Sequence, residues 1–188
     1  MMVTATPTHT WAGVYPALTK PVIGKYSPNH NIDKVIALAL GQVGFVEGVN
    51  NDNPYGASVG MNHEPYCCLG VSWTFRNVGL VDLVAGQYSW GYAECQGALN
   101  IFASKGLVLP HGTPAKAGDI AMWAWDNPNV AEHTELIIED QTPSGLVLVG
   151  WNTSPDHANG SQANGGGTYL RHRSVYGLKA IVRPRYPQ

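Results

Sequence analysis

Hydrophobic positions follow two different periods along this chain, and the period changes near Gly106. Before that glycine, apolar residues recur at helical spacing in three segments, 32–43, 67–77 and 92–104. After it, short β-branched or alternating segments are separated by Pro, Gly, Asn and Asp, and they predict strands at 119–125, 134–139, 146–151, 168–173 and 179–183. Helices followed by a run of strands predict an α+β domain, with the helices packed on an antiparallel sheet.

Polar and turn-forming residues divide the chain. Asn31 is expected to cap the first helix and Gly44 to end it. Residues 47–65 are rich in Asn, Gly and Pro and predict a loop. Four prolines fall within residues 1–30, which predicts an extended N-terminal arm, and residues 31–188 then form a single domain.

Composition excludes several classes of partner. Only 13% of the 188 residues are charged, the net charge is −2 and there is no basic run, so nucleic acid is not an expected partner. The N-terminus has neither the basic nor the apolar region of a signal peptide, and no stretch approaches 18 apolar residues, so membrane insertion is not expected. Six Trp, nine Tyr and many Gly and Asn residues suit an uncharged polar polymer such as a glycan or peptide.

Two of the three cysteines are adjacent at the predicted start of the second helix. Cys67 and Cys68 follow the loop, and Cys95 lies in the third helical segment. Three cysteines cannot form a disulfide framework, and a bridge between adjacent residues is strained. A cysteine at a helix N-terminus is favoured as a thiolate, the nucleophilic form. The structural alternative is that both adjacent cysteines are small buried hydrophobes.

A base and an orienting group for such a thiolate stand at two strand boundaries. His133 comes directly before the strand predicted at 134–139, and Asn152 directly after the one at 146–151. Adjacent antiparallel strands would place both residues at the same end of the sheet. The order Cys67, His133, Asn152 is that of a papain-type catalytic set. Taken alone, a histidine such as His133 is usually a surface or hydrogen-bonded core residue, and Asn152 could simply start a turn.

These residues lie in motifs that resemble the CHAP family, the cysteine, histidine-dependent amidohydrolases/peptidases. The likeness spans residues 32 to 185. The segment 66–73 (YCCLGVSW) resembles the family's Trp-Cys-Ala-x-Phe-Val-Ser-Trp, 117–121 (AGDIA) resembles the Gly-Asp that opens its sheet, and 149–154 (VGWNTS) resembles its Glu-Gly-Asn-x-Ser. Two departures stand out. Gly70 replaces a bulky aromatic residue, and Gly150 replaces a glutamate, which leaves Asn152 alone to orient His133.

The resemblance implies a papain-like (NlpC/P60-like) fold and a peptidoglycan hydrolase, either an N-acetylmuramoyl-L-alanine amidase or a peptide endopeptidase. A bacteriophage endolysin fits best: a monomer made in the host cytoplasm that reaches the cell wall after holin-type release, or a secreted wall hydrolase. The alternatives are a non-catalytic wall-binding or virion tail-associated module on the same fold, and an amidase acting on a small cytosolic amide.

Four further residues are candidates for lining a substrate groove: Tyr66, Tyr55, Trp151 and His63. Core packing is an equal alternative for the three aromatic residues, and a surface loop position for the histidine. No cofactor and no metal are expected. The cysteine and histidine spacings do not match a zinc motif, and the loop before Cys67 offers calcium a single carboxylate, Asp52, among four residues.

Overall fold

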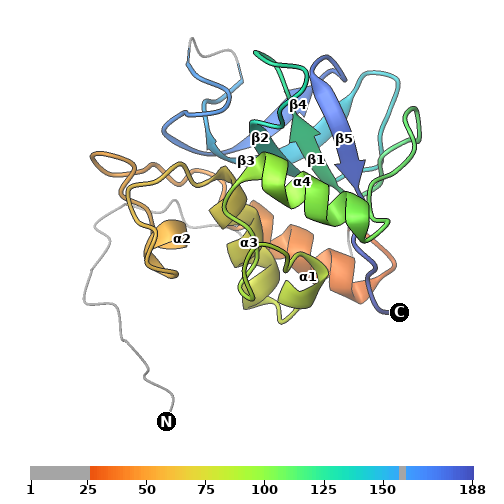
Figure 1. Ribbon diagram of the computed structural model, residues 1–188, viewed down its shortest axis with the longest axis horizontal. Coiled ribbons are helices and arrows are strands. Elements are labelled where there is room, and N and C mark those ends of the chain that lie inside the picture. Colours follow the sequence, from red (N-terminus) through yellow and green to blue (C-terminus); the bar gives the residue numbers. More distant parts are fainter. Residues whose placement is uncertain (1–25, 157–159) are drawn as a thin grey trace.

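The computed structural model describes residues 26–156 and 160–188, and the arm predicted for residues 1–30 lies almost entirely outside them. The α+β prediction is confirmed by a sheet of five antiparallel strands with helices beside it (Figure 1). In chain order the elements are α1 (His30–Leu40), α2 (Pro54–Ala57), α3 (Cys67–Asn77), η1 (Val81–Leu83), α4 (Cys95–Ser104), β1 (Ile120–Trp123), β2 (His133–Ile137), β3 (Leu146–Thr153), β4 (Gly167–Arg173) and β5 (Leu178–Val182).

The sheet has the strand order β4-β3-β2-β1-β5, so β2 is its central strand. Helices α1, α3 and α4 gather on one face (Figure 1). Alternation along the strands sends one set of side chains toward these helices, including Met122, Leu136 and Val149. The other set, including Trp123 and Ile137, forms a second apolar cluster on the opposite face. Both faces of β2 are therefore buried.

Side chains cap three of the four α-helices at their N-termini. Asn29, Asn53 and Glu94 accept backbone N–H bonds at the starts of α1, α2 and α4. The helix α1 begins two residues earlier than predicted because Asn29, rather than Asn31, is this cap. At α3 the capping position holds Tyr66, and no described side chain caps that end. The first N–H groups of the helix that carries Cys67 thus remain free for another acceptor.

Helix α3 approaches β3 very closely at Gly70. A Cβ atom added to this glycine would lie 2.2 Å from Cγ of Trp151, whose ring is fully buried against the helix. The absent side chain at position 70 and the large one at position 151 therefore complement each other. This contact fixes the distance between the helix that starts at Cys67 and the sheet that holds His133.

Gly70→Ala tests this packing. We expect the substitution to lower the free energy of unfolding by about 1–3 kcal/mol, because the methyl group forces helix and strand apart, although alanine is the better helix former. Gly166→Ala is the matched control, since nothing lies within 4 Å of its added Cβ, and its effect should stay within about 0.5 kcal/mol. Urea unfolding measures both. A Gly70→Ala protein as stable as the wild type would contradict the close approach.

Candidate active site

Cys67 is the first residue of α3 and is 5% exposed. Its sulfur lies 4.0 Å from that of Cys68 and 3.9 Å from that of Cys95, the first residue of α4. Hydrogen bonds from these two thiols lower the pKa of Cys67 well below its usual range; burial opposes this effect, and His133 adds to it. The uncapped helix end contributes in the same direction, because its partial positive charge favours an anion.

His133 is the first residue of β2 and is fully buried. Its Nε2 lies 3.4 Å from Oε1 of Glu135, and its ring is tilted against the Trp125 ring at a centroid distance of 5.7 Å. Its Nδ1 is buried with no hydrogen-bond partner among the described residues. Since Cys67 and His133 each shift the pKa of the other, Nδ1 is the ring atom available to the sulfur.

Glu135 is a site residue that the sequence interpretation missed. Residues two apart in a strand share a face, so His133 and Glu135 lie side by side on β2. Arg173 of β4 donates to both carboxylate oxygens at 2.6 and 2.8 Å. Burial opposes the charge on Glu135, but hydrogen bonds and charges from His133 and Arg173 outweigh it and lower its pKa to about 2. The spacing His-x-Glu at the start of a predicted strand was the available signal.

Arg173 is itself held by aromatic rings. Its guanidinium carbon lies 5.4 Å from the ring centroid of Trp123 and 4.9 Å from that of Trp125. The two indole rings stack on each other with centroids 5.4 Å apart. Cation–π contacts of this kind add to the ion pair and keep the guanidinium in one place. A largely buried cation, whose side chain is 10% exposed, therefore holds the Glu135 carboxylate in place.

The charges around His133 favour its imidazolium form. Burial disfavours that form, but hydrogen bonds and negative charge from Cys67 and Glu135 outweigh burial and raise the pKa of His133 to about 9. At neutral pH the site therefore holds a Cys67 thiolate beside a His133 imidazolium, with an ionised Glu135 on the other side of the ring. This is the charge state in which a cysteine is an active nucleophile and a histidine a proton donor.

Asn152, the orienting group predicted from sequence, has other partners. Its Nδ2 donates to the Ala163 carbonyl and to Oδ1 of Asn164, both at 3.2 Å. Its Oδ1 is buried without a hydrogen-bond partner among the described residues. The β2–β3 register would place Asn152 opposite His133 if it continued, but pairing stops at Glu135 and Gly150, and Asn152 has a left-handed φ of 55°. The carboxylate beside the imidazole in this structure is Glu135.

Gly150 explains how Glu135 fits between the strands. The two residues are cross-strand partners, and a Cβ atom at position 150 would lie 2.3 Å from Oε1 of Glu135. The carboxylate of Glu135 thus fills the space that a side chain at 150 would need. The carboxylate beside the imidazole therefore comes from β2, and Gly150 on β3 leaves room for it.

The structure places the three aromatic groove candidates in the core. Tyr55, Tyr66 and Trp151 are at most 1% exposed, and the Tyr55 ring stacks on Tyr66 and meets Trp151 edge-on. These three side chains pack in the core beside α3, and they are too buried to contact a substrate in this conformation. His63 is exposed in the loop before α3, where its Nδ1 lies 2.9 Å from the Asn50 carbonyl oxygen.

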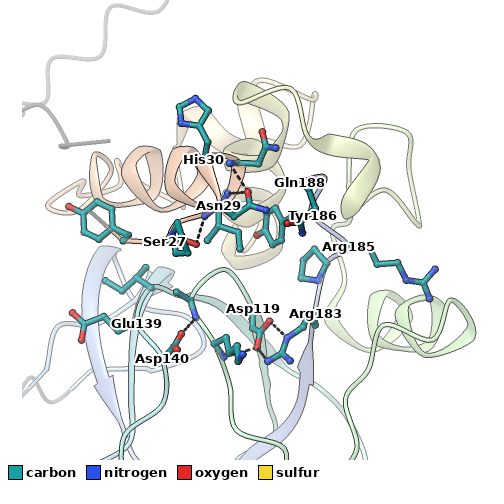
Figure 2. Close-up of a pocket in the computed structure, with 18 residues that line it drawn as sticks. Ser27, Asn29, His30, Asp119, Glu139, Asp140, Arg183, Arg185, Tyr186 and Gln188 are labelled. Atoms are coloured by element: carbon teal, nitrogen blue, oxygen red, sulfur yellow. Dashed lines mark hydrogen bonds and ion pairs between the residues drawn. The ribbon is translucent and has the colours of Figure 1, made fainter. Parts of the chain in front are cut away.

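A cavity and a cluster of thiols are two other features of the described chain that resemble binding sites. A cavity of about 1260 Å³ lies between the start of α1 and the Asp119–Arg183 ion pair (Figure 2), and its lining includes neither Cys67 nor His133. The sulfurs of Cys67, Cys68 and Cys95 lie within 4.8 Å of one another, and among the described residues no histidine or carboxylate completes this group as a fourth metal ligand. A structural zinc site has four ligands.

Comparison with protein-family models, with curated proteins and with solved structures finds no match for this chain. Within the part of the chain that the structure describes, no helix combines the length and the apolar character needed to span a membrane.

The charge network predicts a pH dependence. Because the pKa of His133 is raised above 6.5, its protonation stabilises the fold fully below that pH, and this contribution is lost as the pH rises through about 9. NMR titration of the imidazole should therefore give a midpoint near 9. Glu135→Gln should lower that midpoint, because it removes the negative charge beside Nε2, whereas Glu139→Gln, which changes an exposed carboxylate, should leave it in place.

A double variant allows the same titration if Glu135→Gln alone unfolds the protein. Glu135→Gln leaves the largely buried Arg173 without its anion, at a cost of up to about 3–5 kcal/mol. The double variant Glu135→Gln, Arg173→Met removes both charges and should fold more stably than the single one, while the midpoint of His133 stays below that of the wild type. An unchanged midpoint in a folded double variant would show that Glu135 does not act on His133.

Proposed function

We propose that this protein is a cysteine hydrolase that cleaves an amide bond, with Cys67 as nucleophile, His133 as acid and base, and Glu135 as the group that orients His133. The observation that carries the proposal is the Cys67–His133–Glu135 arrangement, in which the nucleophile begins an uncapped helix and the imidazole is charged. The fold that these elements suggest is papain-like: a cysteine helix packed on an antiparallel sheet whose central strand provides the histidine.

The reaction would proceed in two halves. The Cys67 thiolate attacks the amide carbonyl carbon, and the free N–H groups at the start of α3 are suited to stabilise the oxyanion that forms. His133 then protonates the leaving amine, which breaks the C–N bond and leaves an acyl group on the sulfur. A water molecule that gives its proton to His133 releases the acid product.

Peptidoglycan is the proposed substrate, and an endolysin the proposed biological setting. This part of the proposal rests on the sequence resemblance to the CHAP family together with the low charge and the abundance of Tyr, Trp, Asn and Gly. The bond cleaved is either the link between muramic acid and L-alanine or a bond within the peptides. A non-catalytic wall-binding or tail-associated module on the same fold is the alternative, and it predicts wall binding without any released product.

Digestion of purified peptidoglycan tests the nucleophile. The wild type should release muropeptides, whose masses identify the bond that is cut, and Cys67→Ala should release none. Cys68→Ala is the comparison from the same helix turn; because it removes one of the hydrogen bonds that lower the pKa of Cys67, it should reduce the activity without abolishing it. A wild-type protein that binds walls but releases nothing supports the non-catalytic alternative, and an active Cys67→Ala protein would overturn the assignment.

The orienting residue is tested by a second pair of variants. Glu135→Gln combined with Arg173→Met should lower kcat by about 100-fold or more, since positioned acid–base catalysis contributes on that scale, and should move the alkaline limb of the pH profile downward. Asn152→Gly keeps the left-handed backbone that glycine readily adopts and removes the amide, so kcat should change little. The reverse pattern would identify Asn152 as the orienting group instead.

A further inference from the structure

Three thiols, one of them that of the proposed nucleophile, meet where two helices begin. Cys67 and Cys68 begin α3, and Cys95 begins α4. The approach of the two helices is fixed by Ser72, whose Oγ donates to the Tyr92 carbonyl at 3.0 Å and accepts from the Tyr92 N–H at 2.9 Å. The cluster is thus built by a defined contact between α3 and the segment that leads into α4.

The three sulfur–sulfur distances are unequal. Cys68 and Cys95 are 3.1 Å apart, whereas Cys67 lies 3.9 Å from Cys95 and 4.0 Å from Cys68. A disulfide bond of about 2.05 Å requires Cys68 and Cys95 to approach by only about 1 Å. Two thiolates on one tetrahedral zinc, with bonds of about 2.3 Å, would instead be about 3.8 Å apart. The closest pair is therefore arranged for covalent bonding rather than for metal binding.

Cys67 is the first of the three to react with an oxidant. It is 5% exposed, as is Cys95, whereas Cys68 is 1% exposed. Cys67 differs from Cys95 in its helix end, because no described side chain caps α3 whereas Glu94 caps α4. Hydrogen bonds to Cys67 help to raise the pKa of both neighbours above the usual range for a thiol, so the thiolate of the cluster resides on Cys67. A thiolate reacts with peroxide through its sulfur and becomes a sulfenic acid, and further oxidation would destroy it irreversibly.

We propose that Cys68 and Cys95 form a disulfide bond after hydrogen peroxide has oxidised Cys67, and that this step returns Cys67 to its thiolate form. The Cys67 sulfur attacks one peroxide oxygen, the O–O bond breaks and hydroxide leaves, which gives a sulfenic acid. The Cys95 sulfur attacks the Cys67 sulfur, an S–S bond forms and water leaves with the thiol proton. Cys68 then attacks the Cys95 sulfur and Cys67 departs. In total, two thiols and one peroxide become one disulfide and two waters.

The final thiol–disulfide exchange favours the release of Cys67. In thiol–disulfide exchange the thiol with the lower pKa leaves faster, and Cys67 is the one of the three whose pKa is lowered. A bond between Cys67 and Cys68 is disfavoured because adjacent residues on a helix cannot adopt unstrained disulfide geometry. The remaining product is the Cys68–Cys95 disulfide with a free Cys67. This chemistry goes beyond the proposed hydrolysis, and it holds whether or not peptidoglycan is cleaved.

Peptide mapping of the full chain tests the proposal. The reduced protein is treated with hydrogen peroxide, alkylated and digested with trypsin, which separates Cys95 from the peptide that holds Cys67 and Cys68. We expect a disulfide to join the two peptides, so that their combined mass is two hydrogen atoms below the sum of the separate peptides, apart from one alkyl group. Fragmentation should place that alkyl group on Cys67. A final Cys67–Cys95 bond, a sulfinic acid on Cys67 beside two alkylated thiols, or three unreacted thiols would each overturn it.

Two variants separate the steps. Cys95→Ala should stop at the sulfenic acid of Cys67, which dimedone labels and excess peroxide converts to the sulfinic acid. Cys68→Ala should stop at a Cys67–Cys95 disulfide. Both are compared with the wild type after circular dichroism shows an unchanged fold. Metal analysis of the untreated wild type completes the test, because a stoichiometric zinc ion on the thiols would contradict a free disulfide-forming pair. Loss of peptidoglycan cleavage alone would bear on the proposed function and not on this inference.

Discussion

The ion pair between the buried Glu135 and the largely buried Arg173 is the interaction on which the site depends. Glu135 lies on β2 and Arg173 on β4, so the pair spans the intervening strand β3. A carboxylate in this apolar setting is tolerated because the guanidinium meets it with two hydrogen bonds and is itself enclosed by Trp123 and Trp125. The pair gives the imidazole of His133 a fixed negative neighbour and leaves the thiolate of Cys67 as its other counter-charge.

Helix α3 supplies the other half of the electrostatics. Its end is the one α-helix N-terminus in the described chain without a side-chain cap, and its first residue is Cys67. The aromatic residues Tyr55, Tyr66 and Trp151 belong to the same buried cluster as Cys67. In such surroundings free N–H groups, thiol donors and an imidazolium act on the sulfur with little screening by water.

The sequence predicted the architecture well and the site in part. Strands were found because Pro, Gly, Asn and Asp bracket each one, and α3 because its apolar residues keep helical spacing. The short helix α2 was missed inside a segment whose composition is that of a loop, and α4 starts at Cys95 because Glu94 caps it. The sequence also predicts that Cys67 and His133 belong to one site, and in the structure each of them shifts the pKa of the other. The role of Glu135 depends on strand alternation and on a cross-sheet arginine, which one-dimensional motifs do not convey.

Gly150 has an evolutionary consequence. The carboxylate of Glu135 and a side chain at position 150 cannot both occupy the space between β2 and β3, since a Cβ atom at 150 would lie 2.3 Å from Oε1 of Glu135. Positions 135 and 150 should therefore vary together among homologues, one acidic where the other is small. The same reasoning couples Gly70 with Trp151. Each of these two glycines leaves room for one large or charged partner side chain, Trp151 or Glu135.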